Sequence, residues 1–149
     1  MKIRGFEIVK KYKNSGINLP KRMTKNAAGY DIESAETIEI APGEIRLVAT
    51  GIKVFMRDDE VFYIYDRSSN PRKLGAVLAN SVGIIDADYY NNAENEGAIF
   101  VQLKNIREEI VKIEKGTRIA QGIFAKILLA DDDESKTKLS RTGGFGSTK

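Results

Sequence analysis

Two aspartates near the middle of the chain follow a short apolar run, and their position suits acid–base chemistry. Residues 82–85 are mostly apolar and β-branched, so they predict a buried strand that leads directly into Asp86. Asp88 and Tyr89 come next, followed by a turn at residues 91–92. A strand that ends in a carboxylate, an aromatic ring and a turn forms a rigid pocket wall with one reactive tip. The alternative is an exposed hairpin whose aspartates face water.

The chain contains no cysteine and no histidine. Disulfides, thiolate nucleophiles, imidazole bases and nearly all zinc sites are therefore excluded. Acid–base chemistry near neutral pH must come from aspartate, glutamate, lysine or tyrosine. A bound metal must be a hard cation held by oxygen atoms, and Mg²⁺ is the usual choice beside phosphates.

Length and charge restrict the class of protein further. With 149 residues, 42% of them hydrophobic, the chain fits one ordinary domain with a real core. The formal charge of +3 is small and spread out, which argues against a nucleic-acid partner but is compatible with an anionic small ligand. No apolar run is long enough to span a bilayer, and no apolar signal region follows residues 1–5, so we expect a cytoplasmic protein without a membrane partner.

Short strand-like stretches separated by Gly, Pro and Asn dominate the chain. One pair, residues 37–40 and 45–48, flanks Pro42-Gly43 and predicts a β-hairpin. The pattern predicts an all-β sandwich or jelly roll. The stretches are 2–12, 37–40, 45–48, 52–55, 61–65, 82–85, 98–103, 109–113 and 117–127.

Two interruptions of this pattern carry polar residues. In residues 27–32, small residues and Gly29 permit close backbone approach next to Asp31, although a bulge with a surface aspartate is the alternative. In residues 66–73, Ser68 or Ser69 could cap a short helix whose N–H groups, with the neighbouring Arg67, suit a phosphate. A polar loop with an ordinary cap explains the second segment equally well.

The C-terminal residues change in character. A run of four acids, residues 131–134, should stay solvated. The last residues, 141–149, combine three glycines with one aromatic ring, one arginine and hydroxyls, which is the content of a mobile flap closing over a base and its phosphates. The alternative is a frayed end. We therefore expect residues 1–130 to form the domain and residues 131–149 to form an arm.

Five segments, in this order, resemble the homotrimeric dUTPases. They are Ala28-Gly29-Tyr30-Asp31, Arg67-Ser68, residues 80–89, residues 116–121 and residues 141–148. The resemblance covers almost the whole chain, and its most specific parts are Gly-Ile-Ile-Asp-Ala-Asp-Tyr and Gly-Gly-Phe-Gly-Ser-Thr. It implies a jelly roll with one short helix, a homotrimer with active sites shared between subunits, and Mg²⁺-dependent hydrolysis of dUTP to dUMP and pyrophosphate.

The resemblance also implies roles for individual residues. Asp86 is the general base for the attacking water, Tyr89 packs under the deoxyribose and excludes a 2′-hydroxyl, and Asp31 places the metal through water. The remaining residues bind substrate. Asn80, Gly83, Ile84 and Ile85 read uracil, Phe145 covers it, and Arg67, Ser68, Ser69, Gln121, Arg141, Gly146, Ser147 and Thr148 lie at the phosphates.

The chain departs from the family pattern in three places. Ser69 replaces a usual glycine, Lys149 replaces a common terminal glycine, and a longer insert runs from Tyr90 to Gly97. Two other functions stay open. A dCTP deaminase, alone or combined with diphosphatase activity, uses the same fold but a glutamate base, and a nucleotide-binding regulatory protein could use the insert to contact a partner.

Overall fold

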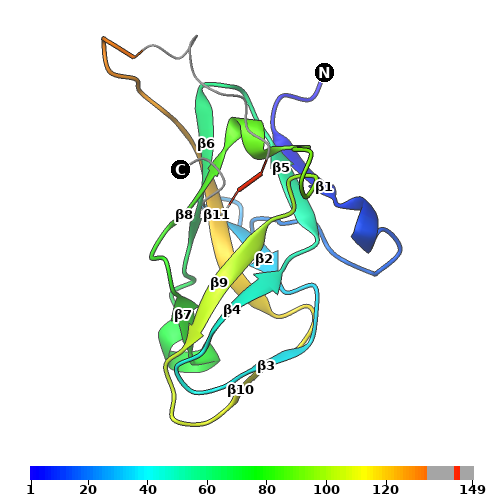
Figure 1. Cartoon of the computed structure of the whole chain (residues 1–149), viewed down its shortest axis with the longest axis vertical. Coiled ribbons are helices and arrows are strands. Elements are labelled where there is room, and N and C mark those ends of the chain that lie inside the picture. The colour runs from blue at the N-terminus through cyan, green and yellow to red at the C-terminus, as the bar shows by residue number, and fades with distance from the viewer. Residues whose placement is uncertain (134–142, 145–149) are drawn as a thin grey trace.

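The protein, described here from a computed structural model at residues 1–133 and 143–144, consists mainly of short β-strands (Figure 1). The strands are β1 (Gly5–Ile8), β2 (Tyr30–Glu33), β3 (Ile38–Ile40), β4 (Ile45–Ala49), β5 (Ile52–Phe55), β6 (Glu60–Tyr65), β7 (Ala76–Leu78), β8 (Gly83–Asp86), β9 (Phe100–Asn105), β10 (Val111–Ile113) and β11 (Arg118–Lys126). Within this part of the chain, no helix is long and apolar enough to cross a membrane.

Two antiparallel sheets form the layers of the fold. The larger has the strand order β2-β11-β6-β8, and the second has the order β4-β9-β7. Figure 1 shows β4 and β9 lying across β2 and β11, while the pairs β1-β5 and β3-β10 extend the layers. The predicted all-β jelly roll is confirmed.

The core lies between the two sheets and follows the alternation of the strands. Phe62 and Ile119 from the larger sheet are fully buried, as are Val101 and Leu103 from alternate positions of β9. Gly122 is required on β11 because an added Cβ would lie 1.9 Å from the Phe62 ring. This glycine therefore allows β11 to pack closely against the Phe62 ring.

The predicted hairpin over residues 37–48 is wrong. The turn exists, with the Glu44 N–H donating to the Ala41 carbonyl at 2.9 Å, but the flanking strands do not pair with each other. Instead, β3 pairs with β10 and β4 pairs with β9. The chain changes sheets at this turn, and local alternation identifies strands without identifying their partners. The Ile45 and Leu47 side chains of β4 are 54% and 50% exposed.

Within residues 1–133 and 143–144, the helical content is limited to three short turns. They are η1 (Lys10–Tyr12), η2 (Asn70–Leu74) and η3 (Ala87–Tyr89), of which η2 has π-helical hydrogen bonding. Ser69 occupies the N-cap position of η2, yet its side chain makes no capping hydrogen bond. The short helix was predicted correctly, but the capping role of a serine hydroxyl was not.

Candidate active site

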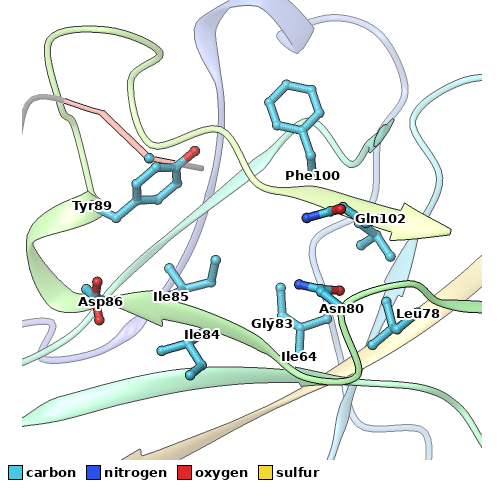
Figure 2. Close-up of a pocket in the computed structure, with 12 residues that line it drawn as sticks. Ile64, Leu78, Asn80, Gly83, Ile84, Ile85, Asp86, Tyr89, Phe100 and Gln102 are labelled. Atoms are coloured by element: carbon cyan, nitrogen blue, oxygen red, sulfur yellow. The ribbon is translucent and has the colours of Figure 1, made fainter. Parts of the chain in front are cut away.

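A cavity of about 250 Å³ opens beside β8, and we call it the base pocket. Its floor is apolar, and Figure 2 shows the Asn80 and Gln102 carboxamides directed into the same space above Gly83. Asp86 and Tyr89 lie together at the other end of β8 (Figure 2). The pocket is lined by Ile64, Leu78, Asn80, Gly83, Ile84, Ile85, Asp86, Tyr89, Phe100, Val101, Gln102 and Gly144.

The position of β8 explains the exposure of Asp86. β8 is the terminal strand of the larger sheet and pairs with β6, with Asp86 opposite Val61 and Gly83 opposite Ile64. Its outer edge therefore presents backbone N–H and C=O groups to a ligand. Asp86 is the last residue of the strand and is exposed, and the chain then turns into η3. The strand, the carboxylate and the following aromatic residue predicted from sequence are present. The predicted burial of the strand is wrong for Ile84, which is 62% exposed because β8 is an edge strand, whereas Ile85 is buried.

Tyr89 is held by hydrogen bonds at its hydroxyl group and at its backbone carbonyl. The residue is only 4% exposed, and its hydroxyl donates to the Ala98 carbonyl at 2.6 Å. The same hydroxyl accepts a hydrogen bond from Asn95 Nδ2 at 2.9 Å. Near the backbone, Asn92 Nδ2 donates to the Tyr89 carbonyl at 2.7 Å. The ring therefore forms a fixed wall of the base pocket.

The insert that departs from the family pattern, residues 90–97, folds as a compact loop over β5. Lys53 of β5 donates through Nζ to Asn91 Oδ1 at 2.5 Å and to Glu96 Oε2 at 2.8 Å. The Lys53 hydrogen bond holds the pKa of the Glu96 carboxyl below its usual value. Positive φ angles at Asn91, Glu96 and Gly97 close the loop.

Sequence reasoning missed three residues at this pocket. Phe100 and Gln102 line it from alternate positions of β9, and Asn95 reaches Tyr89 from the insert. The alternation of β9 placed Phe100 and Gln102 on one face, but nothing in the sequence indicated that this face borders β8. The Asn95 contact depends on the loop conformation, for which a polar sequence gives no signal.

A second group of residues forms what we call the charged cluster. It consists of the predicted site residues Asp31, Arg67 and Gln121 together with Arg118, which was not predicted as a site residue. Asp31 on β2 lies opposite Gln121 on β11 in the strand register. Arg67 Nε lies 3.3 Å from Asp31 Oδ1, and Arg118 Nη1 lies 4.0 Å from Asp31 Oδ2. The Asp31 side chain is 16% exposed, so this ion pair is partly shielded from water.

The segment around Gln121 is fixed by close packing. Gln121 Nε2 donates to the Asp66 carbonyl at 3.0 Å. An added Cβ on Gly29 would lie 2.1 Å from Gln121 Oε1, so the glycine allows the close approach predicted from its sequence context. Ser68 is exposed and Ser69 is half-buried at the start of η2, beside Arg67.

Within one chain, the structure separates Asp86 from Arg67, although the other end of the base pocket borders the charged cluster, where the Leu78 N–H donates to Asp66 Oδ1 at 3.0 Å. Asp86 pairs with Val61, and Arg67 lies six residues farther along from Val61, which corresponds to roughly 20 Å of extended strand. Gly83 pairs with Ile64, between these two points. The base pocket therefore separates Asp86 from Arg67, and Asp31 lies on the opposite edge strand of the sheet.

Two glycines of the predicted arm approach the base pocket. An added Cβ on Gly144 would lie 2.6 Å from Tyr89 Cε1, and one on Gly143 would lie 1.5 Å from Glu94 Oε2. These residues, red in Figure 1, thus contact the ring and the insert. The other arm residues predicted to bind substrate lie outside the described residues. They are Arg141, Phe145, Gly146, Ser147 and Thr148.

Comparisons with known proteins agree on one family. The sequence profile of the dUTPase family matches residues 15–149. A deoxyuridine 5′-triphosphate nucleotidohydrolase from Lactococcus lactis is 64% identical over 148 residues, which cover 99% of each chain. The crystal structure of a dUTPase from Streptococcus mutans superposes with a TM-score of 0.82 at 54% identity, over 85% of this chain and 98% of that one. A mutant dUTPase of Staphylococcus bacteriophage 80alpha with dUpNHpp is 25% identical, with a TM-score of 0.72 over 99% and 98% of the two chains.

Proposed function

The chain belongs to the dUTPase family, and from this premise we propose that it hydrolyses dUTP to dUMP and pyrophosphate. The observation that carries the proposal is the base pocket, in which Asp86 and Tyr89 stand at the end of a strand edge that can read a pyrimidine. Asp86 would act as the general base that activates a water for attack on the α-phosphorus. In a chain without histidine, a carboxylate is the natural base.

The proposed recognition of uracil uses the outer edge of β8. Backbone groups of Gly83, Ile84 and Ile85 and the Asn80 carboxamide would pair with the edge of the base. A cytosine would leave buried donors or acceptors unpaired, which is a strong penalty. Tyr89 would pack against the sugar and leave no room for a 2′-hydroxyl, because the ring is buried and hydrogen-bonded.

The charged cluster fits a triphosphate with Mg²⁺. The described residues contain no group of three or more acidic side chains that could hold a metal by themselves. A single carboxylate such as Asp31 suits a Mg²⁺ ion that takes its other ligands from water and phosphates. When bound, the cation would neutralise phosphate charge. Arg67, Ser68, Ser69 and Gln121 would orient the phosphates.

We propose that sites form between chains of a homotrimer. The supporting argument is that the base pocket lies between Asp86 and Arg67. If the base fills the pocket and the phosphates reach Asp86, the phosphates point away from the charged cluster of the same chain. A second chain must then supply that cluster. Residues 131–149 would act as the arm that closes over the site. A cytoplasmic location remains a prediction.

The substrate proposal is tested by measuring pyrophosphate and ammonia release from dUTP, dCTP and dTTP. We expect pyrophosphate from dUTP alone. Ammonia released from dCTP would instead identify a deaminase on the same fold. Tight binding of dUTP without turnover would identify a regulatory protein that keeps the nucleotide site.

A further inference from the structure

The insert contacts Tyr89 through a closed set of hydrogen bonds that the family pattern does not explain. Asn95 Nδ2 donates to the Tyr89 hydroxyl at 2.9 Å, while Asn95 Oδ1 accepts from Asn92 Nδ2 at 2.8 Å and from the Gly97 N–H at 3.1 Å. Asn92, only 7% exposed, also donates to the Tyr89 carbonyl. The two carboxamides thus connect the hydroxyl and the backbone of one tyrosine.

The Asn92 side chain is fixed in turn by the loop backbone. Its Oδ1 accepts from the N–H groups of Glu94 and Asn95, both at 3.0 Å. Both carboxamides are therefore held by the loop backbone, by each other and by Tyr89. Side-chain hydrogen-bond networks of this kind fix the positions of their members.

We infer that Asn95, supported by Asn92, is a positioning residue that sets selectivity for deoxyribose by holding the Tyr89 ring in place. This inference rests on the proposed function, in which the ring excludes a 2′-hydroxyl. Steric exclusion requires a wall that does not move, because a ring free to tilt accommodates one extra oxygen atom. Asn95 acts on the sugar through Tyr89, and its own side chain does not line the base pocket.

The test compares kcat/KM for dUTP and UTP in wild type, Asn95→Ala and Asn95→Asp. Asn95→Asp keeps the acceptor for Asn92 and Gly97 but loses the donor to the Tyr89 hydroxyl. Losing one such hydrogen bond should lower the dUTP-to-UTP selectivity about three- to tenfold. The change should come mainly from increased use of UTP, with kcat for dUTP nearly kept.

A double-mutant cycle with Tyr89→Phe separates positioning from general damage to the loop. If Asn95 acts through the hydroxyl, Asn95→Ala changes the selectivity no further in the Tyr89→Phe background. The matched control is Asn91→Gly. The Asn91 carboxamide belongs to the same insert but binds Lys53 and not Tyr89. Glycine tolerates the positive φ at this position. This control should keep the wild-type selectivity.

Three results would overturn the inference. The first is an equal fall of kcat/KM for dUTP and UTP in the Asn95 variants. The second is additive changes in selectivity from Asn95→Ala and Tyr89→Phe. The third is a selectivity change in Asn91→Gly as large as that in Asn95→Ala. A wild-type protein that releases no pyrophosphate from dUTP would instead contradict the proposed function. In that case, the affinity ratio for non-hydrolysable dUTP and UTP analogues would still decide the role of Asn95.

Discussion

The base pocket and the charged cluster share the larger sheet, to which the pocket adds side chains from β9, and the protein holds the side chains of the two regions in different ways. The pocket is a largely apolar hollow at a strand edge, and the carboxamides of Asn80 and Gln102 point into it. The cluster is a paired group in which the Asp31 carboxylate lies between two arginines. A hollow with a few polar groups suits a base, and fixed cations suit phosphates.

The separation of Asp86 from Arg67 along the ladder of β6 and β8 supports the proposal that one chain is not a complete site. On that proposal, a nucleotide in the base pocket of one chain meets the charged cluster of another chain. The exposed Ile45 and Leu47 of β4 are consistent with burial between subunits. Each of the following experiments weakens one of the two regions and leaves the other unchanged.

The largest effect is expected in the base pocket from Asp86→Asn. If Asp86 is the general base, kcat for dUTP should fall about 10²- to 10⁴-fold while the affinity for a dUTP analogue is nearly kept. Steady-state rates and equilibrium binding measure the two quantities. Asp88→Asn serves as the matched control, since Asp88 is also exposed but lies outside the pocket. A near wild-type rate for Asp86→Asn would refute the role.

In the charged cluster, Arg67→Ala should lower kcat/KM for dUTP about 10- to 100-fold, because a charged hydrogen bond to phosphate is lost. Arg67→Lys should fall between wild type and Arg67→Ala, since it keeps the charge without the planar fork. Arg46→Ala, which removes an arginine outside both regions, controls for net charge. An unchanged kcat/KM in Arg67→Ala would exclude phosphate binding by this residue.

A smaller change in the same cluster is expected from Gly29→Ala. The new Cβ would displace the Gln121 carboxamide, whose Oε1 lies 2.1 Å from that position, and weaken its bond to the Asp66 carbonyl. We expect kcat/KM for dUTP to fall about two- to fivefold, the value of one neutral hydrogen bond. In a Gln121→Ala background the same substitution should add no loss. An equal loss there would mean that Gly29 acts independently of Gln121.

The smallest effect concerns the insert beside the base pocket. Because Lys53 lowers the pKa of Glu96 from its ordinary value of 4.5, this pair stabilises the fold above that pH and loses its contribution as pH falls through the lowered pKa. At about pH 7, Glu96→Gln should reduce the free energy of unfolding by about 0.5–1 kcal/mol. Denaturant unfolding should show this difference shrinking in acid.

The control for the pH experiment is Glu114→Gln, whose side chain pairs with Lys112 at 65% exposure and should contribute little. A difference between wild type and Glu96→Gln that grows as pH falls would have the wrong sign. That result would mean that the carboxylate of Glu96 is not stabilised by Lys53.

The sequence predicted the type of fold and several residues of both regions, for physical reasons that are local. A run of apolar, β-branched residues identified β8, and Gly29 indicated a close contact that the structure contains. Partners could not be predicted in the same way. The turn at residues 41–44 looks like a hairpin, yet the pairing of β3 with β10 depends on contacts more than 70 residues apart.

The site was predictable only where the residue types themselves suggest chemistry. Asp86 follows a strand and Arg67 precedes a helical turn, which are local signals. Phe100 and Gln102 enter the pocket because β9 lies near β8, and Asn95 reaches Tyr89 because the insert closes on itself. No local pattern reports either event, so these residues required the three-dimensional structure.

Complementation between two impaired variants tests the central claim most directly. Asp86→Asn and Arg67→Ala chains are mixed, unfolded and refolded together, and dUTP turnover is compared with that of each variant refolded alone. If one chain supplies the base pocket and another the charged cluster, mixed assemblies contain some sites with both intact residues and regain a substantial fraction of activity. A mixture no more active than its separate components would contradict a site shared between chains.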